Sequence, residues 1–274
     1  MTKQAFEITA GKRTYVKAKK AYYAGSPIMT DAEFDKLEER IRKAEPDWKE
    51  LHRTGVKVGS KKSVKLRKFL PSLNKITDDQ QDKLNRWYSK RNRRLLVMPK
   101  YDGNSLLLTY YKGKPLSLVT RGDGENGEDV SYFLSTLVDA GQIPDTILEK
   151  RYVDLRVEAI MDQETFAKRW AGQFDAARNM VGGLFNRQDV HKAMRDVSII
   201  VLRAWVENKP VKTTVGDELA WARRQGFGGS SCVAEAVVCA DFPPVAKLNK
   251  ILTGMRKRSR FELDGLVIHD DFAV

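Results

Sequence analysis

A lysine followed closely by an acid and a glycine is the feature of this sequence best suited to chemistry. Lys100-Tyr101-Asp102-Gly103 comes directly after the apolar residues 95–98, which predict a strand. On a strand, residues i and i+2 point to the same face, so we expect Lys100 and Asp102 to be neighbours. Gly103 permits another backbone to approach closely. Since lysine is almost fully protonated near neutral pH, a nucleophilic role requires desolvation or nearby cations. Alone, the motif fits a surface ion pair before a turn.

A glycine-rich loop follows at residues 120–130, which read Thr-Arg-Gly-Asp-Gly-Glu-Asn-Gly-Glu-Asp-Val. Its three glycines allow a tight loop, and the planar guanidinium of Arg121 suits phosphate oxygens. We expect a helix to begin near Glu128. The plainer interpretation of this segment is an acidic turn between two elements.

The elements that must position these residues follow from local patterns. Thr30 and Glu33 form a capping box at the start of a helix that ends near Pro46. Residues 112–115 signal a hairpin. Further strands are expected at 152–161, 197–206, 233–239 and 263–269, and further helices at 163–171, 176–185, 213–225 and 245–255. The sequence therefore predicts an α+β fold, with a small helical N-terminal domain before an antiparallel-rich domain.

Charge and cysteine content limit the class of protein. Lys and Arg exceed Asp and Glu by 49 − 36 = 13, which favours a polyanionic partner such as DNA. Two cysteines, Cys232 and Cys239, and three histidines exclude a four-ligand structural zinc site. We expect two unpaired thiols. No signal peptide or membrane-length apolar stretch is present, so a cytoplasmic location is expected.

The lysine motif and the glycine-rich loop together resemble the adenylation domain of NAD-dependent DNA ligases, which has K-x-D-G followed by T-R-G-D-G-x-x-G-E-D-V/I. Three later segments extend the resemblance in the same order. Leu155-Arg156-Val157-Glu158 is similar to the family's V-R-G-E strand, residues 174–189 are similar to its N-P-R-N-x-A-A-G segment, and residues 263–268 are similar to its I-D-G-V-V-I strand. The implied fold is the nucleotidyltransferase domain of ligases, related to the ATP-grasp fold.

The resemblance implies catalytic roles for three residues. Lys100 would attack the α-phosphorus of NAD, form a lysyl-AMP intermediate and expel nicotinamide mononucleotide. Asp102 would support the lysine, and Asp264 would lie near both the lysine and a hydrated Mg²⁺. Glu158 and, through water, Glu262 are the other residues implied near the metal.

The resemblance also implies contacts to the AMP group. Glu158 would bind the ribose hydroxyls, because a carboxylate accepts two such bonds. Arg121 and Arg178 would contact AMP or its phosphate. Ser72 and Leu73 would border the adenine.

An N-terminal segment indicates NAD as the substrate. Residues 22–35 resemble the signature of the domain that holds the nicotinamide mononucleotide half, and the implied contacts are Tyr22, Tyr23, Asp31, Phe34 and Asp35. Asp31, Phe34 and Asp35 are at i, i+3 and i+4 and are expected to share a helix face. Two adjacent carboxylates and an aromatic ring suit a cationic pyridinium. Alternatively, Phe34 is a core residue and the aspartates are solvated.

Three positions depart from the family's pattern. Met98 stands where the family usually has a glutamate that recognises the adenine amine, so base recognition is expected to use backbone groups. Phe34 replaces the usual tyrosine. His269 stands where the family has a phosphate-binding lysine, and as a partly charged residue at neutral pH it is expected to make a weaker contact.

The predicted domains are a nicotinamide mononucleotide-binding domain at 1–58, a basic linker or exposed arm at 59–76 and an adenylation domain at 77–274. The family continues beyond the counterpart of His269 with an OB-fold, a zinc module and further domains. We therefore expect either a truncated chain or one subunit of a split, possibly phage, ligase, whose partners are nicked duplex DNA and a region or second polypeptide carrying the OB-fold and zinc module. Two alternatives are an ATP- or GTP-using enzyme similar to RNA ligases or capping enzymes, and an inactive basic scaffold that binds nucleic acid.

Overall fold

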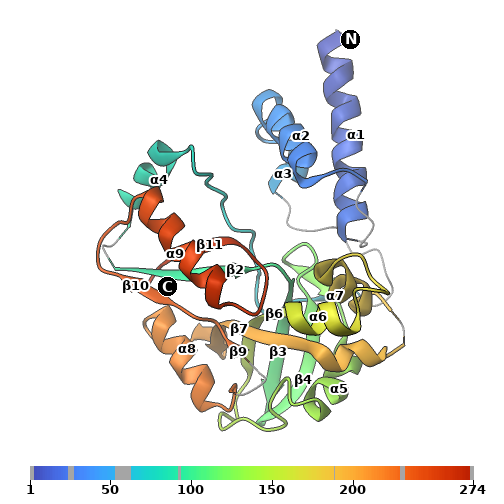
Figure 1. The fold of residues 1–274 in the computed structure, drawn as a ribbon, viewed down its shortest axis with the longest axis vertical. Helices are drawn as coiled ribbons and strands as arrows, with labels where there is room; N and C mark the ends of the chain where they lie inside the picture. The colour runs from blue at the N-terminus through green and yellow to red at the C-terminus, as the bar shows by residue number, and fades with distance from the viewer. Residues whose placement is uncertain are drawn as a thin grey trace.

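The N-terminal region consists of helices that form a small core of their own. The structure is a computed structural model that describes residues 3–23, 28–52, 63–91, 94–187, 189–228 and 232–271. Three helices make up this region (Figure 1): α1 (Lys3–Tyr23), α2 (Asp31–Ala44) and α3 (Lys49–His52). Tyr15, Ile41 and Leu51 are buried where the helices meet. The predicted capping box is confirmed, since Thr30 Oγ1 accepts from the Glu33 amide while the Glu33 carboxylate accepts from the Thr30 amide.

Two antiparallel-rich sheets are the framework of the rest of the molecule. In the larger, six-stranded sheet the strand order is β4-β3-β6-β7-β8, with β9 parallel to β7. Its strands are β3 (Asn104–Tyr111), β4 (Lys114–Thr120), β6 (Val153–Met161), β7 (Val197–Val206), β8 (Lys209–Pro210) and β9 (Cys232–Val233). The smaller sheet has the order β10-β2-β11, formed by β10 (Val237–Cys239), β2 (Leu95–Tyr101) and β11 (Leu263–Asp270). A separate pair joins β1 (Ser63–Lys65) to β5 (Asn126–Glu128).

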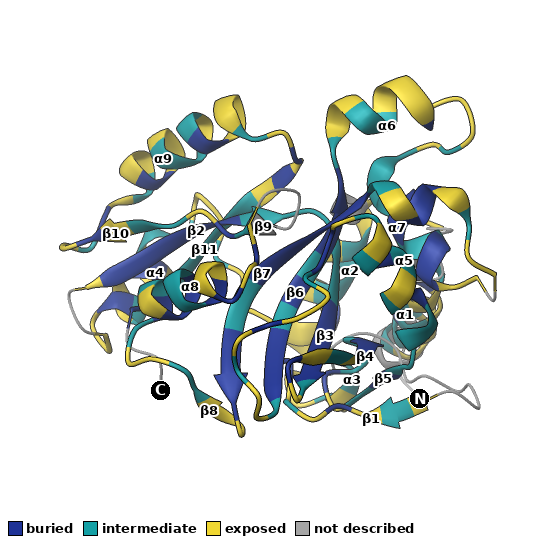
Figure 2. Cartoon of the chain, turned by 90° about the horizontal axis from the view of Figure 1, so that it is seen from below, coloured by how far each residue is buried: buried dark blue, intermediate teal, exposed yellow. Residues whose placement is uncertain are grey.

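Helices cover the outer faces of both sheets. The main core lies between one face of the larger sheet and a group of helical segments, and β3, β6 and β7 are accordingly buried along most of their length (Figure 2). These segments are η1 (Ser131–Phe133), α5 (Leu134–Asp139), α6 (Gln163–Arg169), α7 (Ala177–Phe185) and η2 (Lys192–Asp196). The outer face of the smaller sheet packs on α4 (Gln81–Tyr88) and α9 (Val245–Arg258). Between the sheets, Leu96 and Met98 pack against Ile160, Ile200 and α8 (Val215–Arg224).

The predicted α+β class is confirmed, with two local corrections. Residues near Glu128 form β5 rather than a helix start, because they pair with β1, and helical structure begins at Ser131. The strand expected at 233–239 is two short strands, because β9 pairs with β7 in one sheet and β10 with β2 in the other. Cys239 is a free, buried thiol as expected, and the Cys232 side chain lies outside the described residues. None of the helices in the described ranges combines the length and apolar character needed to cross a membrane.

Part of the predicted basic arm packs on the larger sheet. Leu66 and Leu70 are buried against Leu107 and Val119, on the face opposite the main core. Arg67, between them, donates to the buried Asp154 at 3.2 Å. Residues 63–70 are therefore bound to the sheet, unlike the exposed arm expected over 59–76, because the two leucines among the basic residues supply apolar anchors.

Candidate active site

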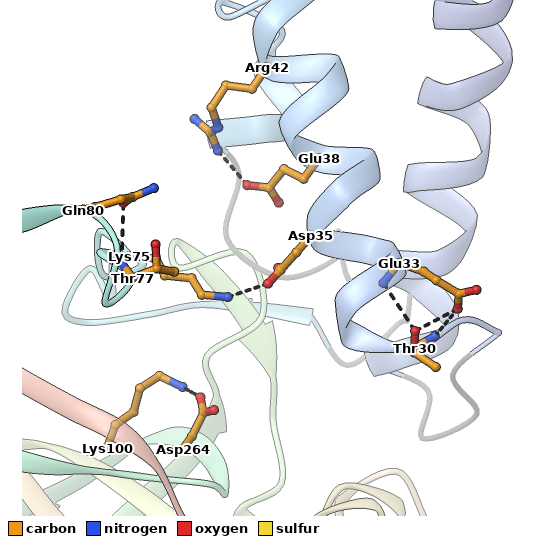
Figure 3. Close-up of polar contacts among 10 residues, drawn as sticks. All are labelled: Thr30, Glu33, Asp35, Glu38, Arg42, Lys75, Thr77, Gln80, Lys100 and Asp264. Atoms are coloured by element: carbon orange, nitrogen blue, oxygen red, sulfur yellow. Dashed lines mark hydrogen bonds and ion pairs between the residues drawn. The ribbon is translucent and has the colours of Figure 1, made fainter. Parts of the chain in front are cut away.

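Lys100 lies near the end of β2, next to the residues that are buried between the two sheets. Leu96, Met98 and Lys100 alternate along β2 onto the same face, and the first two are buried between the sheets. Lys100 is paired in register with Gly265 of β11, and its Nζ donates to the carboxylate of Asp264 (Figure 3). The two side chains are 43% and 49% exposed. The backbone of Lys100 is thus held by a strand of the core, while its side chain is accessible to solvent.

Gly103 allows the chain after Lys100 to pass directly against β6. A Cβ at this position would lie 2.4 Å from the carbonyl oxygen of Ala159 and 3.0 Å from Cγ of Glu158. Real Cβ atoms do not approach backbone oxygen so closely. The close approach that the motif predicted is therefore present, and it brings Glu158 beside the Lys100 segment.

Asp102 pairs with an arginine rather than with the lysine. Its carboxylate accepts a hydrogen bond from Arg178 of α7, and its backbone N–H donates to the carbonyl oxygen of Glu262. Burial raises the pKa of Asp102, while Arg178 and Lys100 act in the opposite direction. Asp102 is thus within electrostatic reach of Lys100, as spacing predicted, although the direct partner of the lysine is Asp264.

Glu158 is the carboxylate on which the predicted basic contacts converge. It lies on β6 in register with Ser105 of β3. Burial raises the pKa of Glu158 to about 7, and Arg156, Arg121, Arg178 and Lys100 oppose this rise through their charges. Near neutral pH, this carboxyl group is therefore poised between its charged and neutral forms, and the two arginines predicted to contact AMP act on it.

The glycine-rich loop is a tight turn that fixes Arg121. Gly122 has a φ of 53°, and its Cβ would lie 1.9 Å from the carbonyl oxygen of Asn126. The Asp123 carboxylate accepts a hydrogen bond from the backbone N–H of Asn126 at 2.7 Å. The Arg121 amide donates to the Ser105 carbonyl oxygen at 2.9 Å. This geometry holds Arg121 next to the strand that carries Ser105.

His269 differs in charge from the sequence-based expectation. Burial lowers its pKa to about 4, and the charges of Arg203 and Arg156 lower it further. His269 is therefore neutral near pH 7 rather than partly charged. The two cations that act on it, Arg156 and Arg203, are paired in register on β6 and β7, and Arg203 is held by Glu218 at 2.7 Å.

Three buried polar atoms beside the site have no hydrogen-bond partner within the described structure: Asn104 Nδ2, Ser105 Oγ and Arg156 Nε. Buried polar groups are nearly always satisfied, so these atoms are available to a ligand or to water. The motif resemblance did not identify them as site residues. Period-two alternation would have indicated Arg156, which lies on the same strand face as Glu158, and the cross-strand register would have indicated Ser105.

At the predicted nicotinamide end, Phe34 and Asp35 point in different directions. The Phe34 ring stacks on Tyr15, with centroids 4.8 Å apart, and packs in the small helical core. Asp35 instead pairs with Lys75 Nζ at 2.6 Å (Figure 3). Phe34 therefore packs as a residue of the small helical core, which was the alternative to a pyridinium contact. The side chains of Tyr22, Tyr23 and Asp31 lie outside the described residues.

The predicted adenine segment is exposed. Ser72 and Leu73 follow the buried Leu70, whose amide donates to the Gly124 carbonyl oxygen at 3.0 Å. The segment thus leaves the glycine-rich loop and reaches Lys75 two residues after Leu73. It therefore runs from the glycine-rich loop to the Lys75–Asp35 pair.

The acidic side chains do not form a metal cage by themselves. Within the described ranges, no group of three or more histidine, cysteine, aspartate or glutamate side chains is placed to hold a metal ion. Asp264 contacts Lys100, and the side chain of Glu262 is exposed. Mg²⁺ typically binds through one or two carboxylates together with substrate phosphates and water. The residues present fit that arrangement, with Asp264 as the carboxylate in contact with Lys100.

Comparisons with known proteins show the family of this chain. The family model for the NAD-dependent DNA ligase adenylation domain matches residues 67–273. The DNA ligase of Acanthamoeba polyphaga mimivirus is 29% identical over 256 residues, which cover 91% of this chain and 38% of that protein. DNA ligase 1 of Nocardia farcinica is 32% identical over 186 residues, covering 64% of this chain and 28% of that protein. The chain thus spans well under half the length of these relatives. A solved RNA ligase mutant of Naegleria gruberi covers 86% of this chain and 66% of its own, at 10% identity and a TM-score of 0.40, too distant to describe the fold further.

Proposed function

This chain belongs to the family of NAD-dependent DNA ligase adenylation domains, and we propose that its site transfers the AMP group of NAD to Lys100. The observation that carries the proposal is the Lys100–Asp264 contact between β2 and β11, with Glu158 and Arg178 in electrostatic reach. In the reaction, Lys100 Nζ forms a bond to the α-phosphorus. The bond from that phosphorus to the bridging oxygen breaks, and nicotinamide mononucleotide leaves with the electron pair.

Lys100 must lose a proton to attack, and Asp264 is the group in contact with it. Its carboxylate accepts the hydrogen bond from Nζ, holds Nζ in line with the phosphorus, and passes the proton on to solvent, so that the attacking group is already positioned. Asp102 acts through Arg178: their ion pair fixes the guanidinium at the edge of the site, where it stabilises charge developing on the phosphate.

Glu158 binds the AMP ribose in this proposal. A carboxyl group with a pKa of about 7 exchanges its proton readily near neutral pH and can meet a pair of hydroxyls in either form. The unpartnered Ser105 Oγ and Arg156 Nε lie on the same sheet face and offer further polar contacts. Arg121 contacts AMP or its phosphate. Ser72 and Leu73 border the adenine, and His269 contributes a neutral contact only.

Mg²⁺ would be held by Asp264 and the substrate phosphates, with Glu158 and Glu262 contributing through water. When bound, it would neutralise phosphate charge and so ease attack by the amine. The site's own cations, Arg121 and Arg178, supply part of the same neutralisation.

The nicotinamide half binds α2 in this proposal, with Asp35 facing the positively charged pyridinium. Tyr22, Tyr23, Asp31 and the exposed part of Phe34 are the further proposed contacts. The ATP- or GTP-using alternative gives these residues no role, because neither nucleotide carries a pyridinium ring.

Nick sealing by the whole protein is a separate proposal. The substrate would be nicked duplex DNA, to which the net charge of +13 is complementary. The relatives extend well beyond the part this chain matches. An OB-fold and a zinc module, in the same or a second polypeptide, are the regions we propose for holding the duplex.

Mass spectrometry of the intact chain tests the proposed function. Incubation with NAD and Mg²⁺ should add the mass of AMP, and peptide mapping should locate it on Lys100. Lys114→Ala is the control, because it removes an exposed lysine of a Lys–Asp pair away from the site. An adduct formed from ATP but not from NAD, or mapped to another lysine, would contradict the proposal.

A further inference from the structure

Lys75 stands between the two ends of the site. Its Nζ pairs with Asp35 of α2 at 2.6 Å, and Figure 3 shows this pair above the Lys100–Asp264 pair. Asp35, Asp264 and Glu38 all raise the pKa of Lys75, so the ammonium lies within electrostatic reach of acids from both α2 and β11. Lys75 is therefore a cation placed where the N-terminal helices face the sheets.

The backbone of Lys75 is anchored while its side chain is open. Its carbonyl oxygen accepts from Lys83 Nζ at 2.6 Å, which ties the segment to α4. The side chains of Lys75 and Asp35 are 69% and 56% exposed. An exposed ion pair of this kind contributes little to stability. A ligand can therefore replace Asp35 as the partner of Lys75 with little loss of free energy.

The chemistry of NAD places a negative charge near this ammonium. If the pyridinium lies at Asp35 and the α-phosphorus at Lys100, the phosphate of the nicotinamide half must lie between them. The acids Asp35, Glu38 and Asp264 would repel that phosphate. Lys75 is a cation within electrostatic reach of all three.

We propose that Lys75 binds the phosphate of the nicotinamide mononucleotide half of NAD, leaving Asp35 free to face the pyridinium. The inference rests on the proposed function. In the ligand-free protein, Lys75 neutralises Asp35; when NAD binds, the pyridinium takes over Asp35 and the ammonium turns to the phosphate. Lys75 keeps its protons throughout. It stabilises the leaving group, which gains negative charge as the bond to the α-phosphorus breaks.

Two ligands that differ only in the phosphate test this assignment: nicotinamide mononucleotide and nicotinamide riboside. Their affinities for the full chain are measured by calorimetry, with Lys75→Ala, Lys75→Arg and the control Lys114→Ala. The control removes a similarly exposed Lys–Asp pair, with a 2.7 Å separation and exposures of 58% and 66%. Lys75→Ala should weaken binding of the mononucleotide by about tenfold or more and leave riboside binding unchanged. Lys75→Arg should restore most of the loss.

The rate of AMP transfer gives a second measurement. At saturating NAD, Lys75→Ala should slow single-turnover adduct formation by about 10²-fold, the effect expected for one preorganised contact to developing charge. Combination with Asp35→Ala separates this role from a simple tether between the two regions. A tether acts only through Asp35, so Lys75→Ala would then have no further effect in the Asp35→Ala background. A phosphate contact predicts a further loss in that background.

The outcomes distinguish this inference from the proposed function. If the wild-type chain forms no adduct with NAD, the proposed function fails. If the wild-type chain forms the adduct and Lys75→Ala matches Lys114→Ala in rate and in both affinities, only the assignment of Lys75 is overturned. Equal weakening of mononucleotide and riboside binding would also overturn it, since the riboside has no phosphate.

Discussion

At the lysine end of the site (Lys100, Asp102, Glu158 and Asp264), three side chains stand on strands, and Asp102 directly follows one. At the nicotinamide end (Asp35 and Lys75), one residue stands on an exposed helix and the other on an irregular segment. The lysine end is backed by buried residues of both sheets, whereas an exposed ion pair joins Asp35 to Lys75.

This difference indicates how each end meets its half of the substrate. Strand register and the close approach at Gly103 fix the lysine end before any ligand binds. At the nicotinamide end, the existing pair must exchange partners. We therefore expect the lysine end to determine the chemistry, and the nicotinamide end to determine which AMP donor is accepted.

The largest effect is expected from Lys100→Ala. The variant should form no AMP adduct, because it lacks the amine that contacts Asp264. Its thermal midpoint should stay close to that of the wild type, since the Lys100 side chain is 43% exposed. Mass spectrometry and a thermal unfolding curve measure the two properties. A normal adduct yield would remove Lys100 from the mechanism.

Gly103→Ala should disturb the lysine end by displacing the strands that position its residues. The added Cβ would meet the Ala159 carbonyl oxygen at 2.4 Å, so β3 and β6 must shift. A loss of about 1–3 kcal/mol in the free energy of unfolding is expected, together with slower adduct formation. Urea unfolding measures the stability. Gly172→Ala is the matched control, because its Cβ would meet nothing within 4 Å; equal stability of the two variants would argue against the close approach.

Asp35→Ala should affect the nicotinamide end selectively. Adduct formation from NAD should slow by about tenfold or more, because the pyridinium loses its carboxylate. Release of AMP from adenylylated Lys100 by pyrophosphate should change much less, because that reaction involves no pyridinium. Glu39→Ala, which removes an exposed ion pair from the same helix, is the control. Equal slowing of both reactions would place the nicotinamide site elsewhere.

The smallest effect concerns pH, and it tests the buried part of the lysine end. Glu158 has a pKa raised from 4.5 to about 7, so its ionisation lowers stability as the pH rises through that range. His269 has a pKa lowered from 6.5 to about 4, so protonation of the unfolded chain lowers stability as the pH falls through that range. The two slopes oppose each other in the wild type.

Single substitutions should expose each slope. Compared with the wild type, Glu158→Gln should gain stability at pH 8 relative to pH 5, and His269→Gln should gain stability at pH 5 relative to pH 8. Thermal midpoints measured across this range check both signs. If neither variant changes the slope, the two groups titrate normally and are not buried as described.

Local patterns predicted the elements well, whereas pairings between distant segments were not visible in them. Residues 197–206 were expected to be a strand and form β7 with those bounds, because their apolar character is a local signal. Residues near Glu128 were expected to begin a helix, yet they pair with β1, which lies far earlier in the chain. No window of the sequence around Glu128 contains that partner.

The site shows the same division. Family resemblance identified the residues that meet at the lysine end, but spacing predicted Asp102 as the neighbour of Lys100. The register of β2 against β11 makes Asp264 the direct partner. Likewise, the neutral state of His269 depends on its partial burial beside Arg203 and Arg156, and the position of Lys75 depends on how the helices face the sheets. Neither property is encoded in local spacing.

The arrangement of the smaller sheet has a consequence for the order of events during synthesis. Strand β2, which carries Lys100, is flanked on both sides by strands made much later, β10 (Val237–Cys239) and β11 (Leu263–Asp270). Such non-local pairings form slowly and leave strand edges open in the meantime. While the ribosome is still translating the segment up to residue 263, β2 has neither its final neighbour nor the carboxylate of Asp264. On the proposed mechanism, Lys100 therefore lacks its partner Asp264 until almost all of the residues matched by the family model have been made.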